Sequence, residues 1–153
     1  MNGLFGLLLI LHILASIAVI GPAFLVPVIR RSARTAGQLR FAFSITSKLA
    51  IFPKMGGAVL ILTGIWLMIL TKMGLSQMWL NLSILLALLM VATIGGLIEP
   101  RMKKVMQIVS EAQGQRDEVP AEFVRAMKKI APLESTAQFL MIAITVLMVV
   151  KPF

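Results

Sequence analysis

The sequence predicts an all-α, polytopic membrane protein: a four-helix bundle that forms a single domain over residues 1–153. Of the 153 residues, 59% are hydrophobic and 14% are charged, so too few polar residues are present to cover a soluble domain of this size. Four long apolar stretches lie at 4–29, 49–70, 79–98 and 133–150. At 1.5 Å per residue, each can cross a hydrocarbon core about 30 Å thick.

The first stretch is expected to remain in the protein as a helix and not to be removed as a secretion signal. Its start, Met1-Asn2-Gly3, carries no basic side chain. The apolar run that follows is longer than the core of a cleavable signal. We therefore count it as the first span.

The connections between spans 1 and 2 and between spans 3 and 4 are predicted to be amphipathic helices. Apolar residues recur there at helical spacing: Leu39, Ala42, Phe43 and Thr46 in the first, and Met102, Val105, Met106, Val109, Phe123, Met127 and Ile130 in the second. Such helices extend the spans or lie on the membrane surface. The polar stretch 113–118 should form the turn of a helical hairpin.

The charge distribution predicts the orientation of the bundle. The formal net charge is +9, and thirteen of the fifteen Lys and Arg residues lie in these two connections or where they enter the next span. The exceptions are Lys72 and Lys151. By the positive-inside rule, the connections face the cytoplasm and both termini face outward. The lipid bilayer is the expected partner of this charge; nucleic acid is not, because no aromatic-rich or groove-reading element accompanies it.

His12 is the only histidine, and no other ionisable side chain lies between residues 4 and 29. Such a group is costly in a bilayer and therefore marks a functional site by default. Two interpretations stay open: an axial ligand to haem or a metal, or a proton-handling group; and a buried histidine that hydrogen-bonds a Ser or Thr of a neighbouring helix. In both cases the ring should point into the bundle, because its N–H has no partner in lipid.

A polar stripe on the fourth span is expected to line the bundle interior. Its members fall at i, i+4, i+7 and i+11 and so share one helix face: Glu134, Gln138, Met141 and Thr145. Counting depth from the span ends places Met141 and Thr145 level with His12, and we predict that the ring points to them. On the second span, Gly57 and Gly64 share a face that allows close helix approach or leaves room for a flat ligand.

Three charged residues, Lys54, Glu99 and Glu134, are predicted to meet at the cytoplasmic ends of their spans. An ion pair between Lys54 and either glutamate would lock the helix ends together or form a site for a charged ligand, which Gln138 would extend. A basic rim would hold the propionates of a porphyrin: Arg30, Arg31, Lys54 and Lys129.

Other metal chemistry is less favoured by the sequence. The chain has no cysteine, which excludes disulfides, thiolate metal sites and iron–sulfur clusters. Its eleven methionines raise the question of copper(I), since thioethers are soft ligands, but they are scattered and are ordinary core residues. No second histidine or paired carboxylate accompanies His12 for hydrolysis.

The order of several short motifs resembles a known family. His12 is followed by Gly-Pro-Ala-Phe-Leu-Val-Pro at 21–27; the second span contains Phe-Pro-Lys-Met at 52–55 and Thr-Gly-Ile-Trp at 63–66; the last span opens at Glu134 and is followed by Lys-Pro-Phe at 151–153. This arrangement resembles the HemJ family of the bacterial inner membrane, oxygen-linked protoporphyrinogen oxidases that bind haem b. It also resembles the wider superfamily that contains the CopD copper-resistance proteins.

The resemblance implies a four-helix bundle in which His12 ligates haem b or is essential to porphyrin oxidation, with Glu134 at an acidic position of the family. The chain departs from the HemJ pattern at two places. It has Arg30-Arg31-Ser32 where a second histidine is usual, and Asn81 and Ser83 where a lysine is usual. An uncharacterised sister family that keeps the fold and the first histidine is the alternative.

Two functional hypotheses follow. In the first, the chain is a haem- or porphyrin-associated membrane redox protein, with His12 as axial ligand and a second ligand from Met141, Met68 or the His12 of a second copy in a homo-oligomer. In the second, it is a copper transport or accessory protein, or a structural membrane protein without catalysis. An absorption spectrum separates them, because bound haem gives an intense Soret band.

The predicted topology can be tested by cysteine labelling in this cysteine-free chain. A Gly114→Cys variant should resist a membrane-impermeant thiol reagent added to intact cells, because the basic connections face the cytoplasm. A Lys72→Cys variant, on the opposite side, should be labelled and serves as the control. Labelling of Gly114→Cys from outside would show that the chain has the opposite orientation in the membrane.

Overall fold

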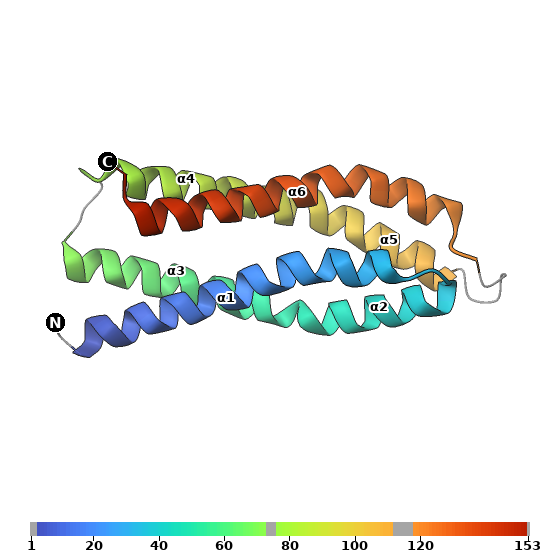
Figure 1. The fold of residues 1–153 in the computed structure, drawn as a ribbon, viewed down its shortest axis with the longest axis horizontal. Helices are drawn as coiled ribbons and strands as arrows, with labels where there is room; N and C mark the ends of the chain where they lie inside the picture. Colours follow the sequence, from blue (N-terminus) through green and yellow to red (C-terminus); the bar gives the residue numbers. More distant parts are fainter. Residues whose placement is uncertain (1–2, 73–75, 112–117, 153) are drawn as a thin grey trace.

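Four long helical runs make up the structure, as the sequence predicts (Figure 1). The computed structural model describes residues 3–72, 76–111 and 118–152. The first run is α1 (Gly3–Ser32), and the second is α2 (Ala36–Leu49) followed by α3 (Ile51–Thr71). The third consists of α4 (Met78–Ala92), the π-helix η2 (Thr93–Ile98) and α5 (Glu99–Glu111), and the fourth is α6 (Ala121–Val150). All four are long and apolar enough to cross a membrane.

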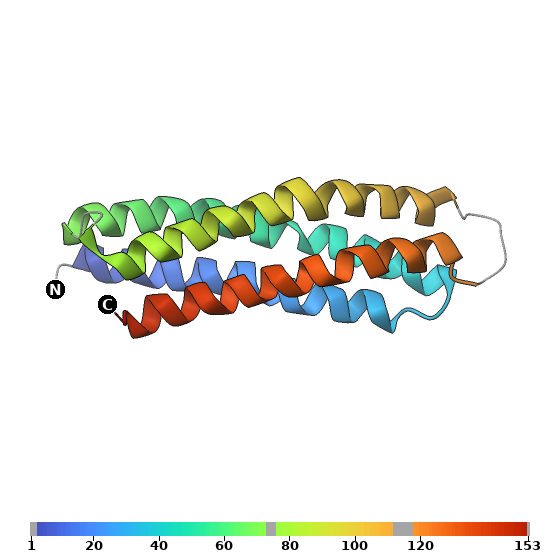
Figure 2. The ribbon, with the colours of Figure 1, turned by 90° about the horizontal axis from the view of Figure 1, so that it is seen from above.

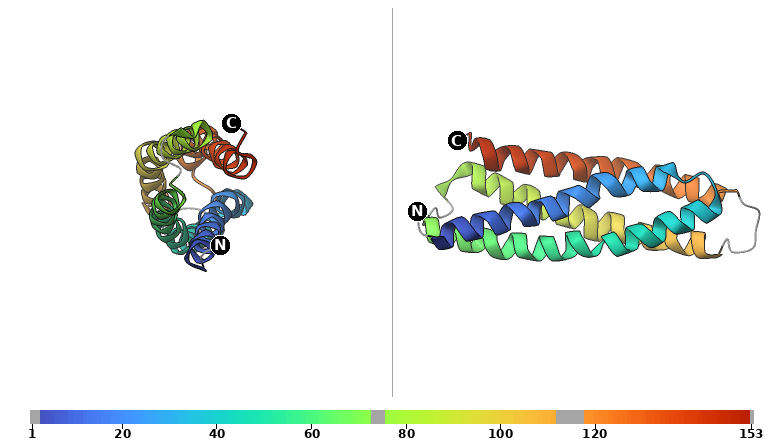
Figure 3. Two further views of the ribbon diagram at one scale, coloured as in Figure 1. Left: turned by 90° about the vertical axis from the view of Figure 1, so that its left-hand side faces the viewer. Right: turned by 60° about the horizontal axis from the view of Figure 1, so that its bottom comes forward.

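The bundle consists of two helix pairs. α1 packs along α3, and α4 packs along α6 (Figures 1 and 3). Both chain termini lie at one end of the molecule, here called the terminal end (Figure 2). The opposite end, called the basic end, carries α2, α5, the last turn of α1 and the first turns of α6. The pairs are joined chiefly by contacts of α2 with α5 and of α1 with α6.

The best-packed core lies at the basic end, where the predicted amphipathic helices are confirmed. They extend the spans end to end instead of lying across them (Figure 1). Their apolar faces form one cluster of buried residues: Leu39, Phe43, Val105, Val109, Phe123 and Ile130. The Phe43 and Phe123 rings meet edge to face with their centroids 6.1 Å apart. Apart from Glu118, the predicted hairpin turn at 113–118 lies outside the described residues.

The start of α2 is fixed by a local capping arrangement. The Thr35 side chain accepts a hydrogen bond from the Gln38 backbone N–H, and the Gln38 side chain accepts one from the Arg34 backbone N–H. These two bonds satisfy donors that a helix start otherwise leaves unpaired. The turn after α1 is therefore short, and α2 folds back beside α1 (Figure 1).

The membrane-spanning parts expose most of their apolar side chains. In the most apolar window of each run, only 11–22% of the residues are buried inside the chain, and the others are half-buried or exposed at its surface. Small polar side chains inside these runs bond their own helix: Ser83 donates to the Trp79 carbonyl at 2.8 Å and Thr93 to the Leu89 carbonyl at 2.8 Å. A hydroxyl satisfied in this way can lie in hydrocarbon at little cost.

The third run contains a wide turn at η2. Pro100 cannot donate a backbone hydrogen bond and would collide with a regular α-turn before it. The chain instead forms a π-helix over Thr93–Ile98, in which the Glu99 N–H bonds the carbonyl of Ile94, five residues back. The inward stripe shifts by one residue across this turn: Trp79, Ser83, Leu86, Met90 and Thr93 precede it, and Ile98, Met102, Val105 and Val109 follow it.

The seam between α1 and α3 is closest at Gly56. A Cβ atom built on Gly56 would lie 3.0 Å from the Ala15 carbonyl oxygen, 3.1 Å from a Val19 methyl and 3.2 Å from the Ala18 Cβ. The sequence-based choice of Gly57 for this contact is wrong, since a Cβ there meets nothing within 4 Å. One residue along a helix rotates the side chain by about 100°, and depth counting cannot detect that rotation.

Substituting these neighbouring glycines tests the seam. Gly56→Ala should destabilise the protein by about 1–3 kcal/mol, because the new methyl group meets a backbone oxygen that cannot move aside. Gly57→Ala, in open space on the same turn, should leave stability unchanged or slightly raised. Thermal unfolding in one detergent measures both, and equal midpoints for the two variants would show that α1 and α3 are not held at this point.

Candidate functional site

His12 lies on the inward stripe of α1 and faces α3. Its Nδ1 is 2.9 Å from the Thr63 hydroxyl oxygen. Gly64 lies beside the ring: a Cβ at that position would be 3.3 Å from His12 Cε1. The ring is half-buried between the two helices. The sequence-based expectation that it points into the bundle is confirmed, and Thr63 is the hydroxyl partner that one of the two open interpretations supposes.

The hydrogen bonds of Thr63 indicate which ring nitrogen carries the proton. A threonine hydroxyl has one hydrogen to donate. The Thr63 oxygen lies 2.6 Å from the Val59 carbonyl of its own helix and donates there. The His12 Nδ1 then donates to Thr63, and Nε2 carries the lone pair. Nε2 is thus the nitrogen with ligand character.

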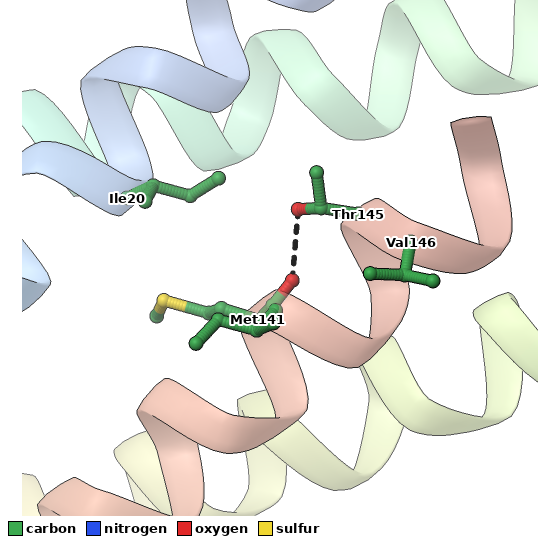
Figure 4. Close-up of a pocket in the computed structure, with 5 residues that line it drawn as sticks. Ile20, Met141, Thr145 and Val146 are labelled. Atoms are coloured by element: carbon green, nitrogen blue, oxygen red, sulfur yellow. Dashed lines mark hydrogen bonds between the residues drawn. The ribbon is translucent and has the colours of Figure 1, made fainter. Parts of the chain in front are cut away.

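The prediction that His12 points to Met141 and Thr145 is wrong. Those two residues face Ile20, which lies two turns further along α1 and about 12 Å from the level of His12 (Figure 4). Met141 is buried, whereas Thr145 is exposed and donates to the Met141 carbonyl at 2.8 Å. The depth count failed because α6 is displaced along the bundle relative to α1, although it ends at Val150 as predicted.

A buried ion pair at the basic end joins the two helix pairs. Arg30, from the last turn of α1, donates from Nη2 to the Glu134 carboxylate of α6. The exposed fractions of the two side chains are 5% and 9%. Nη1 lies 2.8 Å from the Met102 sulfur of α5, and the guanidinium carbon is 6.0 Å from the Phe43 ring centroid of α2. Four helices therefore meet around one guanidinium group.

This pair replaces the predicted cluster of Lys54, Glu99 and Glu134, which does not form. Lys54 is exposed, and within the described ranges no carboxylate lies within ion-pair distance of it. Glu99 is exposed and contacts Lys103 of its own helix at 3.8 Å. A planar guanidinium offers several donors in a rigid fork and is better suited than an ammonium to a buried carboxylate.

Gln138 adds a second link between α1 and α6. Its side-chain Nε2 donates to the Ala23 carbonyl at 2.9 Å. That carbonyl lies one turn before Pro27, which has no N–H to bond it within α1. The polar stripe of α6 therefore faces inward at Glu134, Gln138 and Met141, as predicted, and serves helix contacts there.

The candidate residues fall at two levels that one cofactor cannot bridge. Arg30 comes eighteen residues after His12, about 27 Å along α1, which exceeds the reach of the propionates of a porphyrin bound at His12. Arg30 is also committed to Glu134. The expectation that Arg30 and Arg31 hold the propionates of a porphyrin ligated by His12 is therefore wrong, whereas the same expectation for Lys54 and Lys129 stays a prediction.

Sequence reasoning missed two residues at these sites, Thr63 and Met102. Thr63 had a usable signal, since a hydroxyl next to Gly64 in a span is a natural partner for a histidine. Met102 had no usable signal, because a methionine at helical spacing with other apolar residues is usually an ordinary core residue. Among the described residues, no group of three or more His, Cys, Asp or Glu side chains is placed to hold a metal ion.

A family model described as a predicted integral membrane protein (DUF2269) matches residues 6–152. No curated protein and no solved structure matches the chain.

Removing one partner of the buried pair should be costly. Glu134→Gln leaves the Arg30 charge buried without its counter-ion and should lower the unfolding free energy by about 3–5 kcal/mol. The matched control, Glu99→Gln, removes an exposed pair and should change it by less than about 1 kcal/mol. Unfolding in detergent measures both.

A double replacement distinguishes the pair from general damage. Arg30→Met combined with Glu134→Leu removes both buried charges and should be more stable than Glu134→Gln alone. A double variant as unstable as the sum of the two single variants would show that the two side chains act independently.

Proposed function

The chain belongs to the DUF2269 family of predicted integral membrane proteins, and from this premise we propose that it is a haem- or porphyrin-associated redox protein with His12 as an axial ligand. The observation that carries the proposal is the His12–Thr63 hydrogen bond. Histidines that ligate metals usually donate their other N–H to a neighbouring acceptor, which fixes the tautomer and the ring orientation. His12 has this arrangement before any ligand is added.

The donor set suits a macrocycle better than a bare metal ion. A haem iron takes its equatorial nitrogens from the porphyrin, so the protein need supply only one or two axial donors. A bare copper ion would need several donors from the protein, whereas Thr63, Gly64 and the Leu60 backbone, which lie at the His12 ring, offer no imidazole, thioether or carboxylate donor. A bound haem would supply electron transfer, and the chain's part is to orient it and to exclude water.

The second axial ligand is proposed to come from α3 or from a second copy of the chain. Met141 is no longer a candidate within one copy, because it lies about 12 Å along the bundle from His12. Met68 lies one turn beyond Gly64 on α3 and remains a candidate for the second axial ligand. A second His12 would require that two copies associate, and the many exposed apolar side chains of α1 would permit this.

The resemblance to the HemJ and CopD superfamily supports the same proposal from the sequence. It suggests an oxidoreductase in the bacterial inner membrane, and the distribution of basic residues suggests that both termini lie outside. Positions 30–32, where a HemJ histidine is usual, are occupied here by residues that include the Arg30 of the buried ion pair. The proposal therefore rests on His12 alone and does not require porphyrin oxidation.

The alternative is a structural membrane protein in which His12 only joins α1 to α3. The same hydrogen bond supports this role, since it satisfies the ring N–H within the bilayer. The two roles differ in whether Nε2 binds a ligand.

Absorption spectra of purified variants test the proposal. Wild-type protein expressed with ample haem should show a Soret band, and His12→Ala should lose it while remaining folded. Thr63→Val removes the acceptor of the Nδ1 proton and should retain haem with a shifted band or potential, because the ligand loses its fixed orientation.

The glycines of α3 provide the matched control. Gly64→Ala brings a methyl group to 3.3 Å from the ring and should alter the spectrum, whereas Gly57→Ala meets open space and should not. A wild-type protein without haem, or a His12→Ala spectrum identical to that of wild type, would leave His12 with its structural role alone.

A further inference from the structure

A basic hollow lies between the end of α1 and the first turns of α6. It has a volume of about 280 Å³ and is lined by seven residues, three of them basic and none acidic: Arg30, Arg31, Phe123, Val124, Met127, Lys128 and Ala131. Arg30 is held by Glu134 and Met102, so Arg31 and Lys128 are the charges left to meet a ligand. Both side chains are exposed at the rim. The hollow is thus positively charged at the rim and mostly apolar elsewhere.

A second hollow lies nearer the middle of the bundle, between the same two helices (Figure 4). It has a volume of about 200 Å³ and is lined by Ile20 of α1 and four residues of α6: Met141, Ile142, Thr145 and Val146. None of these side chains is charged. The Thr145 hydroxyl is already bonded to the Met141 carbonyl. This hollow therefore offers an apolar surface and no free polar group.

Both hollows open on the same side of the α1–α6 seam. Ile20 and Arg31 are separated by eleven residues, very nearly three helical turns, and so point in the same direction from α1. On α6, Lys128 and Val146 are separated by eighteen residues, which is five turns. The axial distance between the hollows is about 16 Å along α1, from Ile20 to Arg31, and about 27 Å along α6, from Lys128 to Val146, so it lies between half and the full thickness of a bilayer's hydrocarbon core.

We propose that this seam binds one anionic phospholipid, with the headgroup phosphate at Arg31 and Lys128 and one acyl chain along α1 and α6 to the apolar hollow. The two hollows match the two ends of such a lipid in charge, in order and in spacing. A free phosphate would use the basic hollow only. The lipid accounts for the apolar hollow as well.

The first turns of α6 favour the same occupant. Lys128 lies two turns into α6 and the Val124 N–H is already bonded to the Pro120 carbonyl, so the side-chain charge of Lys128 is the group of α6 that meets the anion. The α1 side presents its C-terminal turn, whose dipole repels an anion, and Arg31 offsets it. The anion is thus expected to lie nearer α6 than α1.

Native mass spectrometry of the full chain in detergent tests the headgroup. Wild-type protein should retain one phosphatidylglycerol and bind phosphatidylcholine with the same chains much more weakly. The double variant Arg31→Gln/Lys128→Gln should bind phosphatidylglycerol about 10- to 30-fold more weakly. Arg40→Gln/Lys104→Gln removes one Arg and one Lys that are exposed at the same end but outside the hollow, and it should bind as wild type.

Two experiments test the position of the acyl chain: a variant that fills the apolar hollow, and a competitor that has a phosphate but no acyl chain. Val146→Trp should weaken long-chain phosphatidylglycerol and leave a short-chain form unaffected, because only the long chain reaches the apolar hollow. Glycerol phosphate at the same concentration should not displace the lipid. Equal binding of the two headgroups, equal binding by the two double variants, or displacement by glycerol phosphate would overturn the proposal, provided that each variant unfolds at the wild-type temperature without added lipid.

Discussion

The Arg30–Glu134 ion pair is the interaction on which the arrangement of the bundle depends. It connects α1 to α6, the two helices that otherwise belong to different pairs. A buried charge is tolerated only when its partner is present, so the pair fixes both the rotation and the axial level of one helix against the other. Met102 and Phe43 complete the surroundings of the guanidinium group and bring α5 and α2 to the same point. Arg30 Nε and Glu134 Oε2 are buried without a hydrogen-bond partner among the described residues, so the pair specifies geometry more than it adds stability.

This constraint divides the molecule into two parts with different packing. At the basic end, amphipathic helices bury their apolar faces against one another as in a soluble protein. In the membrane-spanning part no such driving force operates between apolar helices, and contact depends on small residues and hydrogen bonds. Gly56 and the His12–Thr63 bond supply these between α1 and α3.

Predictions from the sequence were correct for features that depend on composition and helical period. They were wrong for contacts that depend on the direction in which a side chain points around its helix. Helical spacing was enough to place Leu39, Phe43, Val105 and Val109 on apolar helix faces, and all four are buried, whereas Met106 of the same pattern is exposed. Lys54 was expected to meet Glu134 because the two lie at the same end of their spans, yet Arg30 occupies that place. Depth along the axis can be counted from the chain, but the facing direction and the relative shift of two helices follow from packing that one sequence does not reveal. The same limit explains the errors at Gly57 and at Met141, whereas the bond of His12 to a hydroxyl required only the knowledge that its N–H needs a partner.

The wide turn at η2 means that the third run has one residue more than its packing register requires. Trp79, Ser83 and Thr93 follow a regular heptad that, continued as an α-helix, would next bury position 97, yet the residue turned inward is Ile98. Genes change length by whole codons, and loss of one codon inside a helix normally rotates everything beyond it by about 100°. At Gly95–Gly96 the same loss would bring the two inward stripes onto one continuous face of a regular α-helix. This pair of glycines is therefore the place in the span where the length of the chain can change while both packed faces keep their direction.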